Sequence, residues 1–313
     1  FNTLKAAFAD AKKKKVLLYD IMTSRYEITN ILQKDFLHMP EVFGELAKGT
    51  MEDPAFTIIR THYFLKYVSG APLTRPDWYF DTDQEGHGIV DVTTHLVDLV
   101  QWECFPELLL NYQKDIRMLS AKEWPTAITA TQFRKVANQP AYPGFLQKDV
   151  KDSMLQVYAN GEMNYSIRGV HAKITMIWGV QPPEGSGDTH YSCIRGTKAK
   201  LIVRQGKEQH FLPTLYIEDL GEKNKPLTQE VLLKNMRGML EKYPGITLKK
   251  VEKGWELVIP EKYVIGHEQH FALVTQKYLQ YLEEGKLPDW EISAMLAKYY
   301  TTTQALEKAV HIK

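Results

Sequence analysis

The sequence predicts an α+β fold: a large, open, mostly antiparallel sheet with helices on one face, preceded by a fragment of a second α/β unit. Three observations support this prediction. Segments of alternating apolar and polar residues fill the middle of the chain, and their short spacing is typical of an antiparallel meander. Long stretches with helical spacing flank these segments. The first residues give the order helix, strand, helix, which is typical of a parallel α/β sheet.

The first fifty residues contain the predicted α/β fragment. Residues 4–11 place apolar side chains at helical spacing, and the lysines at 12–15 suit a helix C-terminus because they oppose the helix dipole. Residues 16–19 are a short apolar run that predicts a buried strand, and residues 24–37 resume helical spacing. Since one parallel strand cannot form a sheet alone, we expect its partners to lie before Phe1.

The middle of the chain predicts a strand, a long helix and then the meander. Residues 56–67 are rich in β-favouring types, and residues 89–110 have the clearest helical pattern of this region. Asn160-Gly161 predicts a tight hairpin turn between two of the alternating strands. The alternating segments are residues 154–158, 163–168, 173–178, 190–195 and 199–204.

The last third of the chain returns to helices. Residues 228–240 predict a helix capped by Thr228, because a threonine hydroxyl can accept a hydrogen bond from a free N–H of the first turn. Residues 247–258 predict one or two short strands. Two more helices are expected at residues 264–282 and 289–308.

Composition and charge exclude several classes of partner. The chain of 313 residues has 39 Lys and Arg against 38 Asp and Glu, so it lacks the positive excess that neutralises nucleic acid or anionic lipid. No apolar run approaches the ~20 residues of a membrane-spanning helix. The only cysteines, Cys104 and Cys193, exclude a disulfide-rich scaffold and a four-cysteine zinc site. We therefore expect no nucleic-acid partner and no membrane partner.

The start of the chain does not resemble a secretory signal, because its basic run follows an amphipathic stretch instead of preceding an apolar one. Phe1 is expected to be an internal point of a longer precursor, because a natural chain begins with Met or a processed small residue. The compartment stays open between cytoplasm and periplasm.

The segment from Gly86 to Val100 is the most informative for chemistry. On a helix, Asp91, His95 and Asp98 share one face, while apolar residues take the opposite side. A carboxylate one turn from an imidazole can fix its tautomer and raise its basicity, which suits a general base. The pattern therefore indicates a catalytic imidazole at His95.

Other interpretations of these histidines stay open. His95 could be a core histidine satisfied by a neighbouring carboxylate. His87, Asp91 and His95 also recur every four residues, as metal ligands on a helix do, but a glycine at position 88 argues against one continuous helix, so no metal is expected. The segment His267-Glu-Gln-His270 is one residue shorter than the zinc-protease pattern, which favours helix-end or pocket-rim residues.

The glycine-rich entry followed by Asp91, His95 and Asp98 resembles the helix that opens the C-terminal domain of the Gfo/Idh/MocA (glucose–fructose oxidoreductase/inositol dehydrogenase) family. The resemblance implies that the aspartate and histidine at the first two positions line the substrate pocket and that His95 takes a hydroxyl proton. Arg75-Pro76 and Trp78 are similar to the family's approach to the glycine turn. Other matching positions are Arg25 and the stretch Gly196-Thr197-Lys198-Ala199.

The resemblance also implies a division of the chain. Residues 1–50 are expected to be the end of a Rossmann-type dinucleotide-binding domain, and residues 51–313 a substrate-binding, catalytic and oligomerisation domain. The family's Gly-x-Gly-x-x-Gly and Glu-Lys-Pro motifs are absent from the sequence and are expected upstream of Phe1. The full-length protein would use NAD or NADP, whereas this chain would bind the cofactor poorly or not at all.

The function implied by the resemblance is an NAD(P)-dependent oxidoreductase acting on a sugar or polyol hydroxyl. His95 would be the base, and Asp91 would orient it or bind a neighbouring hydroxyl. Further candidate substrate contacts are Asp98, Arg75, Trp78 and Tyr19, and a homo-oligomer is expected through the open sheet face. Alternatives are a non-catalytic sugar-binding or dimerisation module, a family member that uses NAD transiently to cleave glycosides, and a metallohydrolase using His87, Asp91 and His95.

Overall fold

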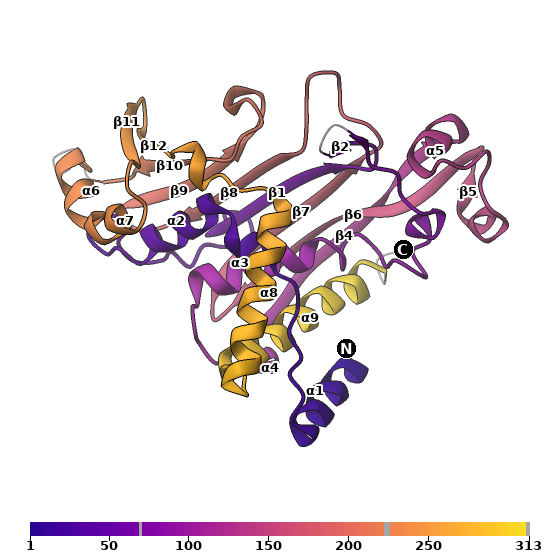
Figure 1. The fold of residues 1–313 in the computed structure, drawn as a ribbon, viewed down its shortest axis with the longest axis horizontal. Coiled ribbons are helices and arrows are strands. Elements are labelled where there is room, and N and C mark those ends of the chain that lie inside the picture. The colour runs from indigo at the N-terminus through magenta and orange to yellow at the C-terminus, as the bar shows by residue number, and fades with distance from the viewer. Residues whose placement is uncertain (69–70, 222–225, 311–313) are drawn as a thin grey trace.

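The computed structural model describes residues 1–68, 71–221 and 226–310, and a ten-stranded sheet is the largest feature of this part (Figure 1). Its strands follow the order β11-β12-β10-β9-β8-β1-β7-β6-β4, with β5 paired to β6. Neighbouring strands are antiparallel except β1 and β7, which run parallel. The strands are β1 (Phe56–Tyr63), β4 (Ile116–Thr129), β5 (Val150–Lys151), β6 (Met154–Ile167), β7 (Val170–Gly179), β8 (Thr189–Arg195), β9 (Ala199–Gln205), β10 (Thr214–Asp219), β11 (Thr247–Val251) and β12 (Gly254–Val258). The predicted large, mostly antiparallel sheet is confirmed.

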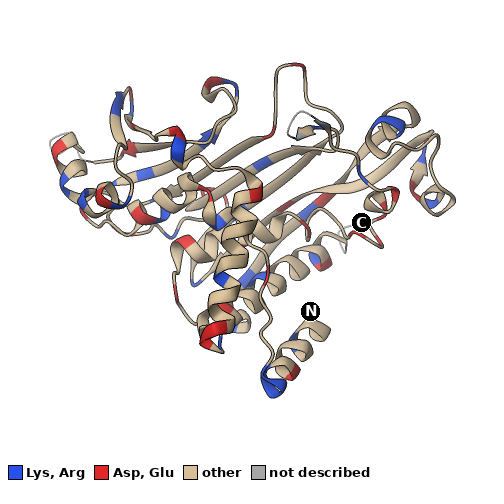
Figure 2. Cartoon of the chain, viewed as in Figure 1, with Lys and Arg blue, Asp and Glu red and all other residues tan. Residues whose placement is uncertain are grey.

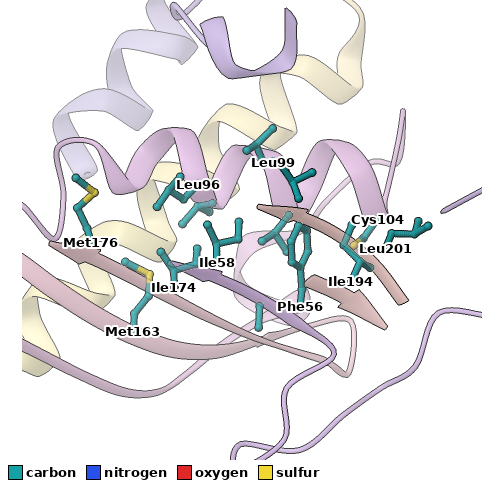
Figure 3. Packing of buried hydrophobic residues seen from close by; sticks show 14 of the residues in the cluster. Phe56, Ile58, Leu96, Leu99, Cys104, Met163, Ile174, Met176, Ile194 and Leu201 are labelled. Carbon is teal, nitrogen blue, oxygen red and sulfur yellow. The ribbon is translucent and has the colours of Figure 1, made fainter. Parts of the chain in front are cut away.

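Helices cover one face of this sheet. Helix α2 (Ile28–Leu37) packs on β9 and β10, α3 (Thr93–Cys104) packs on β7, and α9 (Asp289–Val310) packs on β4 and on α3. In Figure 3 the side chains of α3 face those of the central strands. Since burying one such aliphatic side chain contributes about 2 kcal/mol, this layer dominates the stability of the fold. The apolar residues at this contact include Phe56, Ile58, Leu96, Leu99, Cys104, Met163, Ile174, Met176, Ile194 and Leu201.

The remaining elements lie around this core. Helix α8 (His267–Glu284) contacts the short helix η1 (Thr23–Tyr26), and α1 (Asn2–Lys14) lies apart from the sheet at the bottom of Figure 1. Helices α4 (Tyr112–Asp115) and α5 (Ala130–Ala137) precede and follow β4, and a small hairpin pairs β2 (Tyr67–Val68) with β3 (Ala71–Pro72). Of the helices in the described ranges, none is long and apolar enough to cross a membrane.

Several predicted elements are confirmed with small changes in their bounds. The predicted helix at 89–110 is shorter and forms α3, and the helix at 228–240 is divided into α6 (Gln229–Asn235) and α7 (Arg237–Lys242). The two C-terminal helices form α8 and α9 as expected. The predicted strand at residues 16–19 is wrong: these residues form no strand, and Val16 is 54% exposed. A short apolar run becomes a strand only where another strand satisfies its backbone groups.

The predicted hairpin turn at Asn160-Gly161 is also wrong, because β6 runs through both residues without a turn. The side chain of Asn160 bonds to three neighbours: its amide donates to Trp124 O and Thr126 Oγ1, and its oxygen accepts from the N–H of Trp178. Gly161 stands where a Cβ would approach the Cβ of Ile89 to 2.6 Å. These two residue types therefore serve a tight tertiary contact, and the packing overrides their turn propensity.

Candidate active site

A cavity of about 720 Å³ lies at one end of the helix-covered face of the sheet. Its volume falls within the range of small-molecule binding pockets, about 300–1,000 Å³. The walls come from the sheet, from the start of α3, from η1 and α2, and from the start of α8. Side chains used below that line it are Glu27, Arg60, His62, Lys66, Arg75, Tyr79, Glu85, Asp91, His95, Trp178, Asp188, His190, Gln205, His267, Glu268 and His270.

Strand β1 shows how one sheet face supplies both the core and the cavity. Successive side chains of a strand point to opposite faces, so Phe56, Ile58, Arg60 and His62 share one face. The first two are fully buried in the core, and the last two line the cavity. The inward face therefore changes from apolar to basic along a single strand.

The neighbouring strands make the same change at the same level. Arg60 pairs with His190 of β8, which pairs with Gln205 of β9, and His62 pairs with Trp178 of β7. All five side chains line the cavity. Cross-strand register thus gathers polar groups from four strands into one floor.

The glycine-rich entry brings α3 to the edge of this floor. A Cβ on Gly88 would lie 1.8 Å from the carbonyl oxygen of Ala159, and Gly86 adopts a φ of +99°. Only glycine allows the chain to pass this close to β6 and to turn into α3. Asp91 lies in the turn before the helix, and His95 lies in its first turn.

His95 is a neutral imidazole at neutral pH. Its pKa is lowered to about 4, chiefly by burial and next by the positive charge of Arg60, while the charge of Asp98 opposes the shift. The buried Nδ1 atom has no hydrogen-bond partner among the described residues. The expectation that a carboxylate one turn away raises the basicity of His95 is therefore wrong: among the described residues, His95 donates no hydrogen bond to Asp91, and the net pKa shift is downward.

Asp91 and Arg75 lie in the same cavity without forming an ion pair. Burial raises the pKa of Asp91, and the charge of Arg75 partly offsets that rise. The guanidinium carbon of Arg75 lies 4.6 Å from the ring centroid of Tyr79 and 5.8 Å from that of Trp178. The aromatic rings hold the guanidinium group by cation–π contact. Three of the predicted site residues, Asp91, His95 and Arg75, are thus brought together.

Asp98 lies outside this cavity, in a buried cluster of charges. Its two carboxylate oxygens accept from Arg25 at 2.6 and 2.8 Å, and one of them also accepts from Lys298 at 3.0 Å. Arg25 donates in addition to Glu291 at 2.9 Å. These cations hold the pKa of Asp98 well below its usual range, although its burial acts the other way. The carboxylate connects α3 to η1 and α9, and no oxygen of it is left for a substrate.

Tyr19 and Trp78 also lie outside the residues that line the cavity. The ring of Tyr19 stacks on Tyr278 at 6.2 Å and meets Tyr281 edge-on at 5.5 Å, within the small apolar cluster beside α8. Trp78 is 45% exposed, and its neighbour Tyr79 lines the cavity instead.

The three residues considered as metal ligands, His87, Asp91 and His95, do not lie together in one site. His87 Nδ1 forms a hydrogen bond with a carboxylate oxygen of Glu123 at 2.7 Å. His87 lies outside the cavity lining that contains Asp91 and His95. Among the described residues, no three His, Cys, Asp or Glu side chains cluster closely enough to hold a metal ion. His267 and His270 line the cavity from the first turn of α8, in agreement with their interpretation as rim residues.

The sequence reasoning missed most of the sheet floor. Arg60 and His62 were part of a predicted strand but not candidate site residues. His190 belongs to the predicted strand at residues 190–195, and it lines the cavity from β8. Asp188 joins this floor by bonding to His62 Nδ1 at 2.6 Å and to Lys66 Nζ at 2.9 Å. The pattern that could have identified these residues is the change from apolar to basic at alternate positions of β1.

Comparisons with known proteins agree with this architecture. Residues 32–310 match a family model described as "Putative oxidoreductase C terminal domain". The crystal structure of an oxidoreductase from Parabacteroides merdae is 50% identical, with a TM-score of 0.96 over 99% of this chain and 71% of that chain. A search of curated proteins gave no match.

Two more distant structures share the fold alone. An oxidoreductase from Thermotoga maritima has 15% identity and a TM-score of 0.52, covering 100% of this chain and 68% of that one. A levoglucosan dehydrogenase in complex with NADH and levoglucosan has 12% identity and a TM-score of 0.54, covering 99% of this chain and 68% of that one.

Proposed function

Because this chain belongs to the Gfo/Idh/MocA-type oxidoreductases, we propose that it supplies the substrate-binding and proton-transfer residues of an NAD(P)-dependent enzyme acting on a sugar or polyol hydroxyl. The observation that carries this proposal is a neutral imidazole, His95, which shares a cavity of about 720 Å³ with Asp91 and Arg75. The size suits a small carbohydrate, and the polar floor suits its hydroxyl groups.

The step of the reaction that the residues of this chain can carry out is the proton transfer. Oxidising an alcohol to a carbonyl removes a hydride from carbon and a proton from oxygen, and the proton needs a positioned base. Nicotinamide supplies the hydride acceptor in this class of enzyme. We assign the base to Nε2 of His95, because Nδ1 is sealed from solvent. The lowered pKa keeps the imidazole unprotonated at neutral pH, so it can accept the proton.

Asp91 is proposed to bind a neighbouring hydroxyl of the substrate. Its carboxyl group accepts from the backbone N–H of Val92, and no side chain in the described part of the chain hydrogen-bonds to it, so it can also accept from a ligand. Its raised pKa reflects the cost of burying a charge that lacks a close partner. A sugar hydroxyl that donates to this carboxylate would lower that cost, and Arg75 would bind from the adjacent wall.

The described residues do not by themselves fit a dinucleotide. A pyrophosphate binds where a glycine-rich turn joins a strand to a helix N-terminus. The sequence has no Gly-x-Gly-x-x-Gly, and the two parallel strands, β1 and β7, each lead into another strand. We therefore assign no cofactor-binding residue in this chain, and NAD and NADP are equally open.

Two further parts of the proposal concern organisation. The family model begins at residue 32, inside α2, whose Leu32 and Phe36 belong to the main core. The division at residue 50 and the homo-oligomer contact through the open sheet face stay predictions.

The test compares His95→Asn with wild type in the protein encoded by the complete gene. Sugars and polyols are screened for a change in nicotinamide absorbance, and kcat is measured on the best substrate. Loss of a general base lowers the rate by about 10²–10⁴-fold. The matched control is His210→Asn, because the side chain of His210 is exposed. Its backbone adopts the left-handed conformation, with a φ of 52°, which asparagine tolerates.

Equal turnover by His95→Asn and wild type would show that the base is assigned wrongly. Binding of sugars without turnover by any member of the screen would favour the non-catalytic module instead.

A further inference from the structure

The described part of the chain contains one buried arginine that is fully paired and two cavity arginines that are not. Arg25 is buried against the carboxylates of Asp98 and Glu291. Arg60 and Arg75 line the cavity, and neither forms an ion pair with a described carboxylate. Removing a guanidinium ion from water is costly unless an anion compensates it. The missing compensation at Arg60 and Arg75 therefore needs an explanation.

The surroundings of Arg60 leave hydrogen-bond donors free. Its Nε donates to Nδ1 of His190 at 3.3 Å, and no described acceptor bonds to the two terminal nitrogens. Since His190 Nδ1 accepts, the ring proton is on Nε2, which is buried and without a partner. His190 is only 7% exposed. A buried imidazole N–H without an acceptor thus lies beside a guanidinium group that has no described carboxylate within ion-pair distance, although the charges of Glu27 and Asp188 act on it from farther away. Both groups line the same cavity.

Arg75 presents a similar unsatisfied group on the adjacent wall. Its Nε is buried and has no hydrogen-bond partner among the described residues. Contacts with Tyr79 and Trp178 hold the guanidinium plane but accept no hydrogen bond. Trp178 also contacts His62 of the floor, with ring centroids 5.3 Å apart. The unsatisfied donors of Arg75 and the floor therefore border one space.

The acidic residues of the cavity do not remove this excess of donors. Asp188 is occupied by His62 and Lys66. Burial raises the pKa of Glu27, Glu85 and Asp91, which disfavours their charged forms. Glu268 is exposed at the rim. None of the five is within ion-pair distance of Arg60 or Arg75.

We propose that the substrate is an acidic sugar, whose negatively charged oxygen group binds Arg60 and the Nε2–H of His190 while Arg75 binds from the adjacent aromatic wall. A carboxylate or an ester phosphate offers oxygens in the geometry that a guanidinium group binds with two parallel hydrogen bonds. The inference rests on the proposed function, because it takes this cavity as the substrate site. It narrows the substrate from any carbohydrate to one with an anionic group.

The experiment measures binding to this chain by calorimetry and by thermal shift, without cofactor. The ligands are matched pairs that differ in charge: glucose with glucuronate, galactose with galacturonate, and glucose with glucose 6-phosphate. At least one acidic member should bind about tenfold to a hundredfold more tightly than its neutral partner, since a charge-assisted bond contributes that much. The phosphate and carboxylate pairs distinguish the two sources of the anion. If no acidic sugar binds better than its neutral partner, the proposal is overturned.

Variants locate the anion in the cavity. Arg60→Gln and, separately, Arg75→Gln should each weaken binding of the acidic sugar by about tenfold or more, and Arg60→Gln should leave the affinity for the neutral partner within about threefold. The matched control is Arg204→Gln on β9, which lies outside the cavity and pairs with Glu218. If Arg60→Gln does not fold, Arg60→Lys retains the charge without the planar fork and tests the same contact. Equal affinity of wild type and both variants for the acidic sugar would refute the assignment.

The design separates this inference from the proposed function. His95→Asn should lower turnover in the complete protein by about 10²–10⁴-fold and leave affinity for the acidic sugar within about threefold. Tight binding of acidic sugars without turnover would contradict the proposed function alone. Turnover of neutral sugars by a protein that neither binds nor oxidises acidic sugars would contradict the inference alone.

Discussion

At the scale of single residues, Arg60 connects substrate recognition with the charge state of the base. The pKa of His95 is lowered first by burial and next by the positive charge of Arg60. Other groups that act on it are Asp98 of its own helix, Lys298 of α9 and His267 of α8. An anion bound to Arg60 would cancel part of that positive charge. Substrate binding would then make His95 more basic at the moment when it must accept a proton.

Arg60→Gln should therefore raise the pKa of His95 above about 4, toward the ordinary 6.5. Removing a nearby positive charge favours the protonated imidazole, so the titration moves to higher pH. NMR titration of the histidine Cε1 protons measures the shift, with the His95→Asn spectrum assigning the resonance. In the complete enzyme, the fall of kcat/KM at low pH should move upward in the same direction.

The control for this titration is Arg204→Gln, which removes the same charge from outside the cavity. A His95 titration that stays in place in Arg60→Gln would mean that burial alone sets its pKa.

Sequence patterns identified the residues at the start of α3 and in the turn before it more readily than those on the sheet. His95 and Asp91 interrupt an apolar helical pattern after two glycines, so their spacing alone marked them. His190 and Arg60 lie 130 positions apart, and only the register between β1 and β8 brings them together. Asp98 fits the same helical spacing as Asp91, but its partners Arg25 and Lys298 come from opposite ends of the chain. Such long-range pairing has no local pattern.

At the scale of elements, the position of α3 depends on the buried charges around Asp98. This carboxylate joins α3 to η1 through Arg25 and to α9 through Lys298. Because the first turn of α3 carries His95, the cluster acts as a positioning device for the proposed base.

Asp98→Asn should destabilise the protein by about 3–5 kcal/mol, because it leaves two buried cations without their shared counter-ion. Urea denaturation followed by circular dichroism measures the free energy of unfolding. The matched control is Asp53→Asn, whose partner Arg195 bonds to a carboxylate that is 73% exposed, so less than about 1 kcal/mol should be lost.

The pH dependence of this effect has a defined sign. The folded-state pKa of Asp98 lies below its unfolded value, so its contribution is present above about pH 4 and is lost as the pH falls through the folded pKa. Wild type and Asp98→Asn should therefore differ in stability at pH 7 and converge under strongly acidic conditions. A stability difference that persists at low pH would point to altered packing instead.

Element boundaries could be predicted where a single element determines its own pattern. Helices α8 and α9 follow their apolar spacing closely, and the capping Thr228 accepts from the N–H of Val231 at the start of α6 as expected. The segment at Asn160-Gly161 could not be predicted from local sequence. The side chain of Asn160 hydrogen-bonds to the backbone of β4 and β7, and the missing side chain of Gly161 leaves space for Ile89. Residues 16–19 have strand-like composition but no strand beside them in the described ranges.

At the scale of the whole molecule, the buried apolar residues of the described ranges form one large core and one small cluster. Residues from the start of the chain pack against the small cluster. The large core includes residues of α2, α3, α9 and the central strands. The small cluster is formed by Tyr281, Leu287 and Met295, with Phe8, Leu17 and Tyr19 packed against it. Global architecture was predictable because alternation and helical spacing report which face of each element is buried. The arrangement of α1 was not, because few of its side chains are buried.

Helix α1 should be dispensable for the stability of the rest of the described fold. Ala11 is its only buried residue, and the lysines at 12–15 are exposed and form the blue end of α1 in Figure 2. Phe1 and Phe8 are only partly buried, so their loss should cost about 1–2 kcal/mol and lower Tm by less than roughly 5 °C. Brief trypsin treatment should cut first at the lysines, as mass spectrometry of the fragments would show.

The stability of the α1 deletion should be compared with that of Phe36→Ala in α2. Phe36 is fully buried in the main core, and such a truncation costs about 3–5 kcal/mol. Deleting residues 1–14, which include all of α1, should therefore destabilise the protein less than removing one side chain from α2, because buried apolar contact, and not helix length, determines the stability that each element contributes. Calorimetric scans of the two variants decide this, with affinity for the cavity ligand as a second measurement that the α1 deletion should leave unchanged. A larger loss of Tm on deleting α1 than on Phe36→Ala would mean that the small cluster beside α8 supports the whole fold.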